Sequence, residues 1–159
     1  MLKWLIAGWT GLALLAVATA ASAQGSCLDP DTKAVDPAET QVWRDHEARR
    51  DQGLMSEIAG TWTGDSRNPD GTTNRMTVSY ASDGTLSFTL RQCGKGANGD
   101  CVQTVGRGAW AAFRQGTSIA MARRLSSSQF SELCHHAAGV LTDPDTFVSA
   151  DGQVGRRVR

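Results

Sequence analysis

Two consecutive segments of strictly alternating apolar and polar residues constrain the fold of this chain more than any other feature. The segments span residues 75–80 and 85–90, and a Ser-Asp-Gly turn joins them. Their apolar positions are Met76, Val78, Tyr80, Leu86, Phe88 and Leu90. A period of two directs alternate side chains to opposite faces of a strand, so one set meets a core and the other meets solvent. The pattern predicts a β-hairpin, preceded by a strand that opens at 60–62.

Short strands are predicted over most of the remaining chain. They cover residues 101–113, 117–125, 146–150 and 153–159. Gly106 and Gly108 lie within the first of these and indicate a bend or a close approach of a neighbouring segment. About seven strands joined by tight turns favour a mainly β fold, a small antiparallel up-and-down barrel, because closure removes exposed sheet edges. A partly open barrel or a two-sheet sandwich is the main alternative.

One amphipathic helix is predicted ahead of the strands. Asp36 followed by Pro37 is typical of a helix start, and Gly53 is a natural stop, so the helix is expected over 37–52. An apolar stripe that includes Trp43 would pack over a barrel mouth or a sheet edge. A partner-binding role for this helix is the alternative.

A short second helix is predicted near residues 128–137. Apolar residues there follow i, i+3, i+4, i+7 spacing, which is typical of one face of a helix. They are Phe130, Leu133, Cys134 and Ala137. The spacing favours a helix over a strand in this segment.

The N-terminal 23 residues have the pattern of a secretory signal peptide. Lys3 supplies a positive start, residues 5–20 are apolar and uncharged, and Ala21-Ser22-Ala23 offers small residues for cleavage after Ala23. A retained membrane anchor and a lipid on Cys27 are the alternatives. Cleavage would leave a mature chain without a stable membrane span, in the periplasm or secreted space.

The mature chain is long enough for one domain with a core of its own and too short for two. It divides into an extension at 24–58, which contains the amphipathic helix, and a barrel domain at 59–159. The signal peptide at 1–23 takes no part in the fold.

Four cysteines follow the predicted signal, an even number that suggests two disulfides in an oxidising compartment. Three connectivities are formally possible. Cys93 and Cys101 flank a glycine-rich loop between two predicted strands, which favours a staple between them. The remaining pair, Cys27 with Cys134, would tie the N-terminal extension to the far end of the domain.

Charge and motifs point away from several classes of function. The chain has 16 basic and 16 acidic residues, so nothing indicates nucleic acid or an acidic lipid surface as a partner. No nucleophile elbow, metalloprotease motif, P-loop or dinucleotide fingerprint is present. Cys134-His135-His136 could be considered for zinc or copper, but neighbouring residues seldom share a metal, and we expect a disulfide followed by two solvent-facing histidines. We therefore expect no enzyme activity, no metal site and no cofactor.

Two short motifs resemble the lipocalin-like, calycin-type barrel domains of bacterial exported proteins. They are Gly60-Thr61-Trp62 and the Asp83-Gly84-Thr85 turn. The resemblance implies a barrel in which Gly60 and Trp62 belong to a plug at one end. It also implies that an arginine from the last strand, Arg157 or Arg159, lies across the tryptophan ring, with Arg123 as a rival. The cavity of such a small barrel would be reduced or absent.

These observations lead to an expected function in binding. The chain would be a non-catalytic exported protein that binds a small apolar ligand or an envelope protein partner. Candidate wall residues, which are otherwise core filler, are Met76, Tyr80, Phe88, Trp110 and Met121. The alternative is an inhibitor of a secreted or periplasmic hydrolase that acts through the stapled loop at 94–100. A third reading, a hydrolase or isomerase at the barrel mouth, would depend on Arg123 as its inward polar group.

Overall fold

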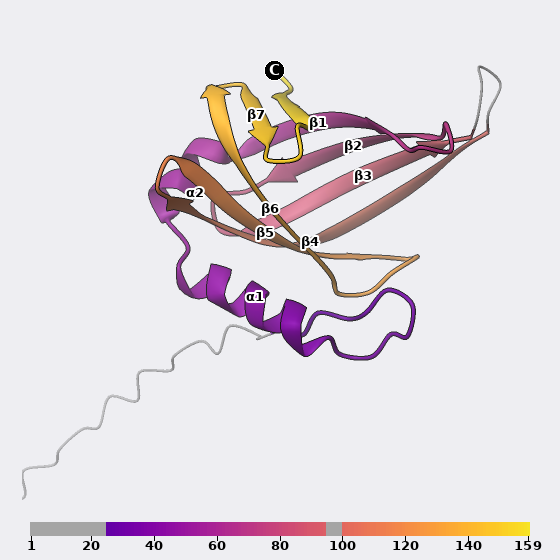
Figure 1. Ribbon diagram of the computed structural model, residues 1–159, viewed down its shortest axis with the longest axis horizontal. Helices are drawn as coiled ribbons and strands as arrows, with labels where there is room; N and C mark the ends of the chain where they lie inside the picture. The colour runs from indigo at the N-terminus through magenta and orange to yellow at the C-terminus, as the bar shows by residue number, and fades with distance from the viewer. Residues whose placement is uncertain (1–24, 95–99) are drawn as a thin grey trace, which may run out of the picture.

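The computed structural model describes residues 25–94 and 100–159, and within them the chain forms a closed antiparallel β-barrel of eight strands (Figure 1). The strands are β1 (Gly60–Arg67), β2 (Thr73–Tyr80), β3 (Thr85–Cys93), β4 (Cys101–Gln115), β5 (Ser118–Ser127), β6 (Leu133–Asp143), β7 (Thr146–Ser149) and β8 (Val154–Arg157). Each strand pairs with the next, and β1 pairs with β8 to close the barrel. The predicted fold class, a mainly β up-and-down barrel, is confirmed. The predicted signal peptide at 1–23 and residues 95–99 of the stapled loop lie outside the described residues.

Two helices precede the barrel, α1 (Pro37–Ala48) and α2 (Gln52–Ile58). The predicted start is correct, since the Asp36 carboxylate accepts hydrogen bonds from the backbone amides of Ala38 at 2.9 Å and Glu39 at 3.1 Å. The predicted single helix to Gln52 is wrong. The backbone N–H of Asp51 donates to the carbonyl of Ala112 on β4, which redirects the chain, and the Asp51 side chain caps α2.

Helix α1 lies on the outer face of the barrel against β4, β5 and β6 (Figure 1). Trp43 is its anchor, with 2 % of its surface exposed, and it packs with Ala122, Ala109 and the Cys27–Cys134 pair. Small alanine side chains on the strands let the helix approach the sheet closely. The amphipathic helix therefore covers a sheet face.

The predicted helix near 128–137 is wrong, because the segment forms strand β6. Leu133 to Gly139 pair residue by residue with Leu125 to Ile119 of β5. Without β6, the β5 edge would be unpaired and the barrel would stay open. Four apolar residues are too few to establish a helix, and the need to pair the β5 edge outweighs their helical spacing. This strand raises the number from the expected seven to eight.

An aromatic cluster occupies part of the barrel interior beside β3, β4 and β5. Phe88 stacks on Phe130 with ring centroids 5.9 Å apart, and Leu125 belongs to the same buried cluster. A Cβ at Gly106 would lie 2.4 Å from the Phe88 ring and 2.4 Å from a backbone oxygen of β5. The predicted close approach at Gly106 is therefore present, and the Phe88 ring occupies the space where a side chain at Gly106 would lie.

Both predicted disulfides are present, and no cysteine is free. Cys27–Cys134 joins the N-terminal extension to β6, and Cys93–Cys101 links the ends of β3 and β4. Disulfides persist in oxidising environments, so the two bonds indicate a location outside the cytoplasm. Among residues 25–94 and 100–159, neither helix combines the length and apolar character needed to cross a membrane.

Candidate functional site

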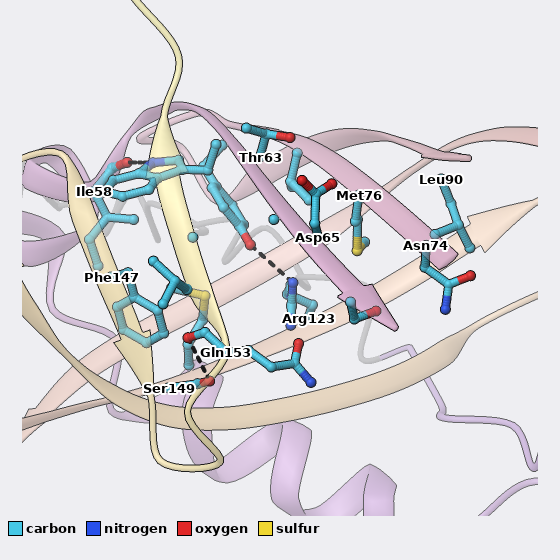
Figure 2. Close-up of a pocket in the computed structure, with 18 of the residues that line it drawn as sticks. Ile58, Thr63, Asp65, Asn74, Met76, Leu90, Arg123, Phe147, Ser149 and Gln153 are labelled. Atoms are coloured by element: carbon cyan, nitrogen blue, oxygen red, sulfur yellow. Dashed lines mark hydrogen bonds between the residues drawn. The ribbon is translucent and has the colours of Figure 1, made fainter. Parts of the chain in front are cut away.

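A cavity of about 260 Å³ lies inside the barrel on the side of β1, β2, β7 and β8 (Figure 2). Its walls are mainly apolar and come from Ile58, Trp62, Met76, Val78, Tyr80, Leu90, Met121, Leu141, Phe147 and Val154. Polar residues on its lining include Asn74, Ser149, Gln153 and Arg123. Three of these wall residues are aromatic, Trp62, Tyr80 and Phe147, whereas Phe88 and Phe130 pack against each other away from the cavity.

Three of the five predicted wall residues line this cavity. Met76, Tyr80 and Met121 project into it from β2 and β5. Phe88 lies away from the cavity, against Gly106 and stacked on Phe130. Trp110 has 2 % of its surface exposed, packs against Tyr80 with ring centroids 4.8 Å apart, and donates from Nε1 to the carbonyl of Ala81 at 2.9 Å. Phe88 and Trp110 are therefore core residues and not part of the cavity lining.

Arg123 is the cation on the cavity lining. The alternation of β5 places it on the same face as Met121, and Figure 2 shows its guanidinium pointing toward the centre of the cavity. One terminal nitrogen donates to the Tyr80 hydroxyl at 3.3 Å, and the other lies 2.8 Å from Nδ1 of His135. Its Nε is buried and has no hydrogen-bond partner among the described residues. A charged and partly buried side chain thus lines the cavity, and its two hydrogen-bond partners are neutral groups.

His135 is the neighbour of Arg123 across the β5–β6 ladder. His135 is exposed at its outer edge, but desolvation beside the barrel wall, together with the nearby Arg123 charge, lowers the pKa of its ring to about 4. The ring is therefore neutral at neutral pH, and its Nδ1 accepts a hydrogen bond from Arg123. His136 faces the outside of the barrel, where its Nδ1 lies 3.3 Å from a carboxylate oxygen of Glu39 on α1.

Two carboxylates lie near the cavity, and each is engaged elsewhere. Asp65 forms a two-point pair with Arg75 at 2.6 and 2.9 Å, and this hydrogen bonding lowers the pKa of Asp65. Asp151, in the turn between β7 and β8, accepts from the Ser149 hydroxyl and from Nε2 of Gln153. Among the described residues, no carboxylate lies within ion-pair distance of Arg123.

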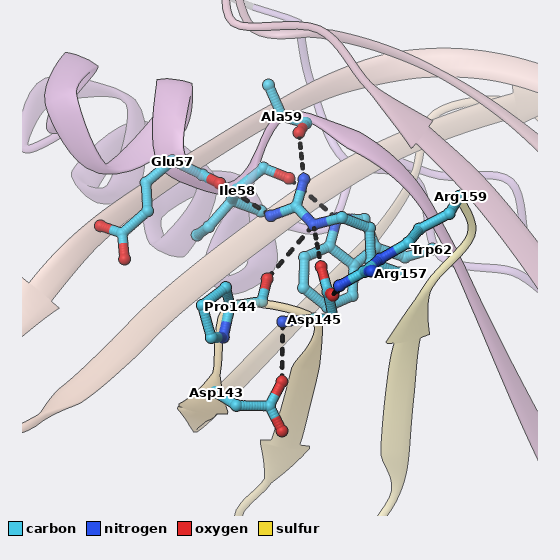
Figure 3. A network of polar contacts seen from close by, with 9 residues as sticks. All are labelled: Glu57, Ile58, Ala59, Trp62, Asp143, Pro144, Asp145, Arg157 and Arg159. Carbon is cyan, nitrogen blue, oxygen red and sulfur yellow. Dashed lines mark hydrogen bonds and ion pairs between the residues drawn. The ribbon is translucent and has the colours of Figure 1, made fainter.

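The predicted plug residues meet at the end of the barrel that α2 covers (Figure 3). The Arg157 guanidinium lies over the Trp62 ring, 4.5 Å from its centroid, and Nε1 of Trp62 donates to the carbonyl of Ile58 at 2.8 Å. Gly60 has a φ of +134°, and a Cβ there would lie 2.7 Å from a guanidinium nitrogen of Arg157. Arg159 pairs instead with Asp145 and lies mostly in solvent. Of the three arginines considered, Arg157 is the one that lies over Trp62.

Arg157 is also held by several backbone and side-chain oxygens. It donates to the carbonyls of Ala59 at 2.5 Å and Glu57 at 2.8 Å, and its Nε lies 3.3 Å from a carboxylate oxygen of Asp145. These contacts tie the last strand to the segment between α2 and β1, which are far apart in the sequence. The Trp62 end of the barrel is closed as a result.

Sequence reasoning missed much of the cavity wall. Leu141 lies on β6, where the sequence predicts a helix near 128–137 and no element after it, so its inward position does not follow from the pattern. Phe147 lies in a predicted strand, but a strand of four residues carries little alternation. Leu90 did belong to the strongest alternating segment and could have been added to the wall from that pattern alone.

The described residues hold no group of three or more histidine, cysteine or carboxylate side chains arranged to bind a metal. Comparisons with known proteins find no match among family models, curated proteins or solved structures. The geometry of the cavity is therefore the basis for a functional proposal.

Proposed function

We propose that this chain is an exported, non-catalytic binding protein that holds a small, mainly apolar ligand inside its barrel. The observation that carries the proposal is the cavity of about 260 Å³ with largely apolar walls, closed at one end by Trp62 and α2. Ligand pockets generally start at about 300 Å³, so the ligand would be a small one. Enclosure in apolar walls removes a ligand's apolar surface from water, which is the main driving force for such binding.

Export and a lipocalin-like origin belong to the same proposal. The two disulfides and the apolar segment before Ala21-Ser22-Ala23 support secretion to the periplasm or beyond, with cleavage after Ala23. The Gly60-Thr61-Trp62 motif and the contact of Arg157 with Trp62 support a calycin-type ancestry. Binding of a small molecule inside the barrel is consistent with both export and a calycin-type ancestry.

A protein partner, including a secreted hydrolase to be inhibited, is the second candidate. It is supported by apolar exposure beside the Cys93–Cys101 staple, where Val102 is 55 % and Val105 60 % exposed. Exposed valines on a stapled hairpin offer a pre-organised surface for contact. The cavity favours the ligand proposal, because a barrel that acts only through its hairpin has no need of an internal space.

Filling the cavity is expected to weaken ligand binding. Met76→Trp places a larger side chain into the cavity, whereas Thr77→Trp places the same side chain on the outer face of the same strand. Calorimetric titration with 1-octanol, a neutral apolar probe, should show binding to the wild-type protein and to Thr77→Trp. The affinity of Met76→Trp should be at least about tenfold lower, a difference of about 1.4 kcal/mol.

Two results would contradict the ligand proposal. One is a wild-type protein that takes up neither octanol nor any charged octyl analogue. The other is a folded Met76→Trp variant that binds the probe as well as Thr77→Trp does.

A further inference from the structure

Arg123 has a charge that the surrounding protein does not neutralise. Arg123 is partly buried, with its Nε fully enclosed, and removing even part of a cation from water is costly unless an anion compensates it. The groups bonded to Arg123 are the Tyr80 hydroxyl and the neutral ring of His135. Neither supplies a negative charge, and the Nε–H is left without a partner among the described residues.

The other arginine at the barrel interior shows what a structural role looks like in this fold. Arg157 lies over Trp62, donates to backbone carbonyls and is paired with Asp145. Its bonding capacity is largely used by the protein itself. Arg123 has the same kind of position on an interior face but lacks both the carbonyl partners and the counter-ion.

We propose that the barrel ligand is a small amphiphilic anion whose carboxylate pairs with Arg123, a specification that rests on the binding function proposed above. A guanidinium has five N–H donors, and two of them suffice for Tyr80 and His135, so donors remain for a carboxylate. The apolar part of the ligand packs against Met76, Met121 and Phe147. The ligand carboxylate thus supplies the negative charge that no described side chain places beside Arg123.

The same chain shows that this pairing geometry is available to it. Asp65 and Arg75 form a two-point carboxylate–guanidinium pair on the outer face. Because the Asp65 carboxylate is committed to that exposed pair, it does not compete for Arg123. Because the Asp65 carboxylate on the lining is paired with Arg75, and the partners of Arg123 are a hydroxyl and a neutral imidazole, the positive charge of Arg123 stays available to an incoming carboxylate.

The size of the cavity limits the length of the apolar part. A volume of about 260 Å³ is what roughly nine molecules occupy in liquid water, at about 30 Å³ each. A saturated carboxylic acid of about eight carbons has a comparable number of non-hydrogen atoms. Octanoate is therefore the matched probe, and 1-octanol has the same chain without the charge.

The test is calorimetric titration of octanoate and octanol into the mature protein at neutral pH. Octanoate is expected to bind at least about tenfold more tightly than octanol, because hydrogen bonds to charged groups are worth more than neutral ones. Arg123→Met should remove that preference, and Arg123→Lys should retain part of it. Arg107→Met, which removes the same charge from an exposed position on β4, should leave the preference unchanged.

The outcomes separate this inference from the function on which it rests. Octanol bound as tightly as octanoate by the wild-type protein would overturn the carboxylate assignment and leave the apolar-ligand function standing. Loss of the preference in Arg107→Met as well as in Arg123→Met would overturn it too, since long-range charge would then account for it. Failure of both probes to bind would contradict the binding function itself. The wild-type comparison decides the matter even where Arg123→Met does not fold.

Discussion

Replacement of Trp62 by alanine is expected to lower the free energy of unfolding by about 3–5 kcal/mol. The side chain is 7 % exposed, belongs to the main buried cluster and lies under the Arg157 guanidinium. Its removal leaves a cavity between α2 and the barrel and unpairs the Ile58 carbonyl. Urea denaturation followed by circular dichroism measures the change, with the midpoint and slope fitted together.

Trp62→Phe is the matched control for this prediction. Phenylalanine keeps an aromatic ring under Arg157 but cannot donate to the Ile58 carbonyl. Trp62→Phe should therefore lower the free energy of unfolding by much less than Trp62→Ala does. A loss of less than about 1 kcal/mol for Trp62→Ala would mean that the tryptophan does not plug the barrel. The proposed calycin-type ancestry would then lose the observation that supports it.

The double substitution Cys27→Ala with Cys134→Ala is expected to lower the free energy of unfolding by about 4–5 kcal/mol. This disulfide joins residues 107 apart in the sequence, and a long closed loop restricts the unfolded chain most strongly. Cys27 is also fully buried, so part of its packing with Trp43 and Ala122 is lost. Denaturation without reductant gives the size of the effect.

Cys93→Ala with Cys101→Ala is the control, because the sequence separation in that disulfide is only 8. The same loop-entropy relation predicts about 2–3 kcal/mol for this shorter bond. Equal costs for the two pairs, or a larger cost for the short one, would show that loop closure does not govern their stabilising effect. The unreduced wild-type protein should contain no thiol that reacts with a thiol reagent.

The fold was predictable wherever one face of a strand meets the core and the other meets solvent. Alternation over 75–80 and 85–90 identified β2 and β3, which pair in register from Tyr80 with Leu86 to Thr73 with Cys93. The disulfides followed from the position of two cysteines around one loop. Local pattern and tertiary structure agree in these segments, so the sequence is informative there.

Strand β6 shows where local pattern fails. Phe130, Leu133, Cys134 and Ala137 are spaced as on a helix, yet the pairing of Leu133 to Gly139 with β5 closes the barrel. Cys134 also has to reach Cys27 on the outer face of the barrel. In a strand, alternation turns Cys134 outward and its neighbours Leu133 and His135 toward the inner face. Non-local pairing of this kind cannot be inferred from a short segment by itself.

The candidate site was predictable only in part for the same reason. Arg123 was recognised as an inward polar residue, but its contact with Tyr80 joins residues 43 apart, and its neighbour His135 lies on the strand that was misassigned. Whether the barrel interior holds a cavity depends on how its large side chains, such as Phe88 and Phe130, pack against one another. Such packing is a property of the whole barrel and not of any one segment.

Native mass spectrometry of the mature protein, purified from its own cell envelope without refolding, shows whether the barrel carries a ligand. We expect a complex of the protein with one small organic molecule, released on activation as a singly charged anion. The protein itself should be four hydrogens lighter than the reduced chain, since both disulfides are closed. A bare protein mass, under conditions that retain added octanoate, would contradict the claim that this barrel carries a ligand.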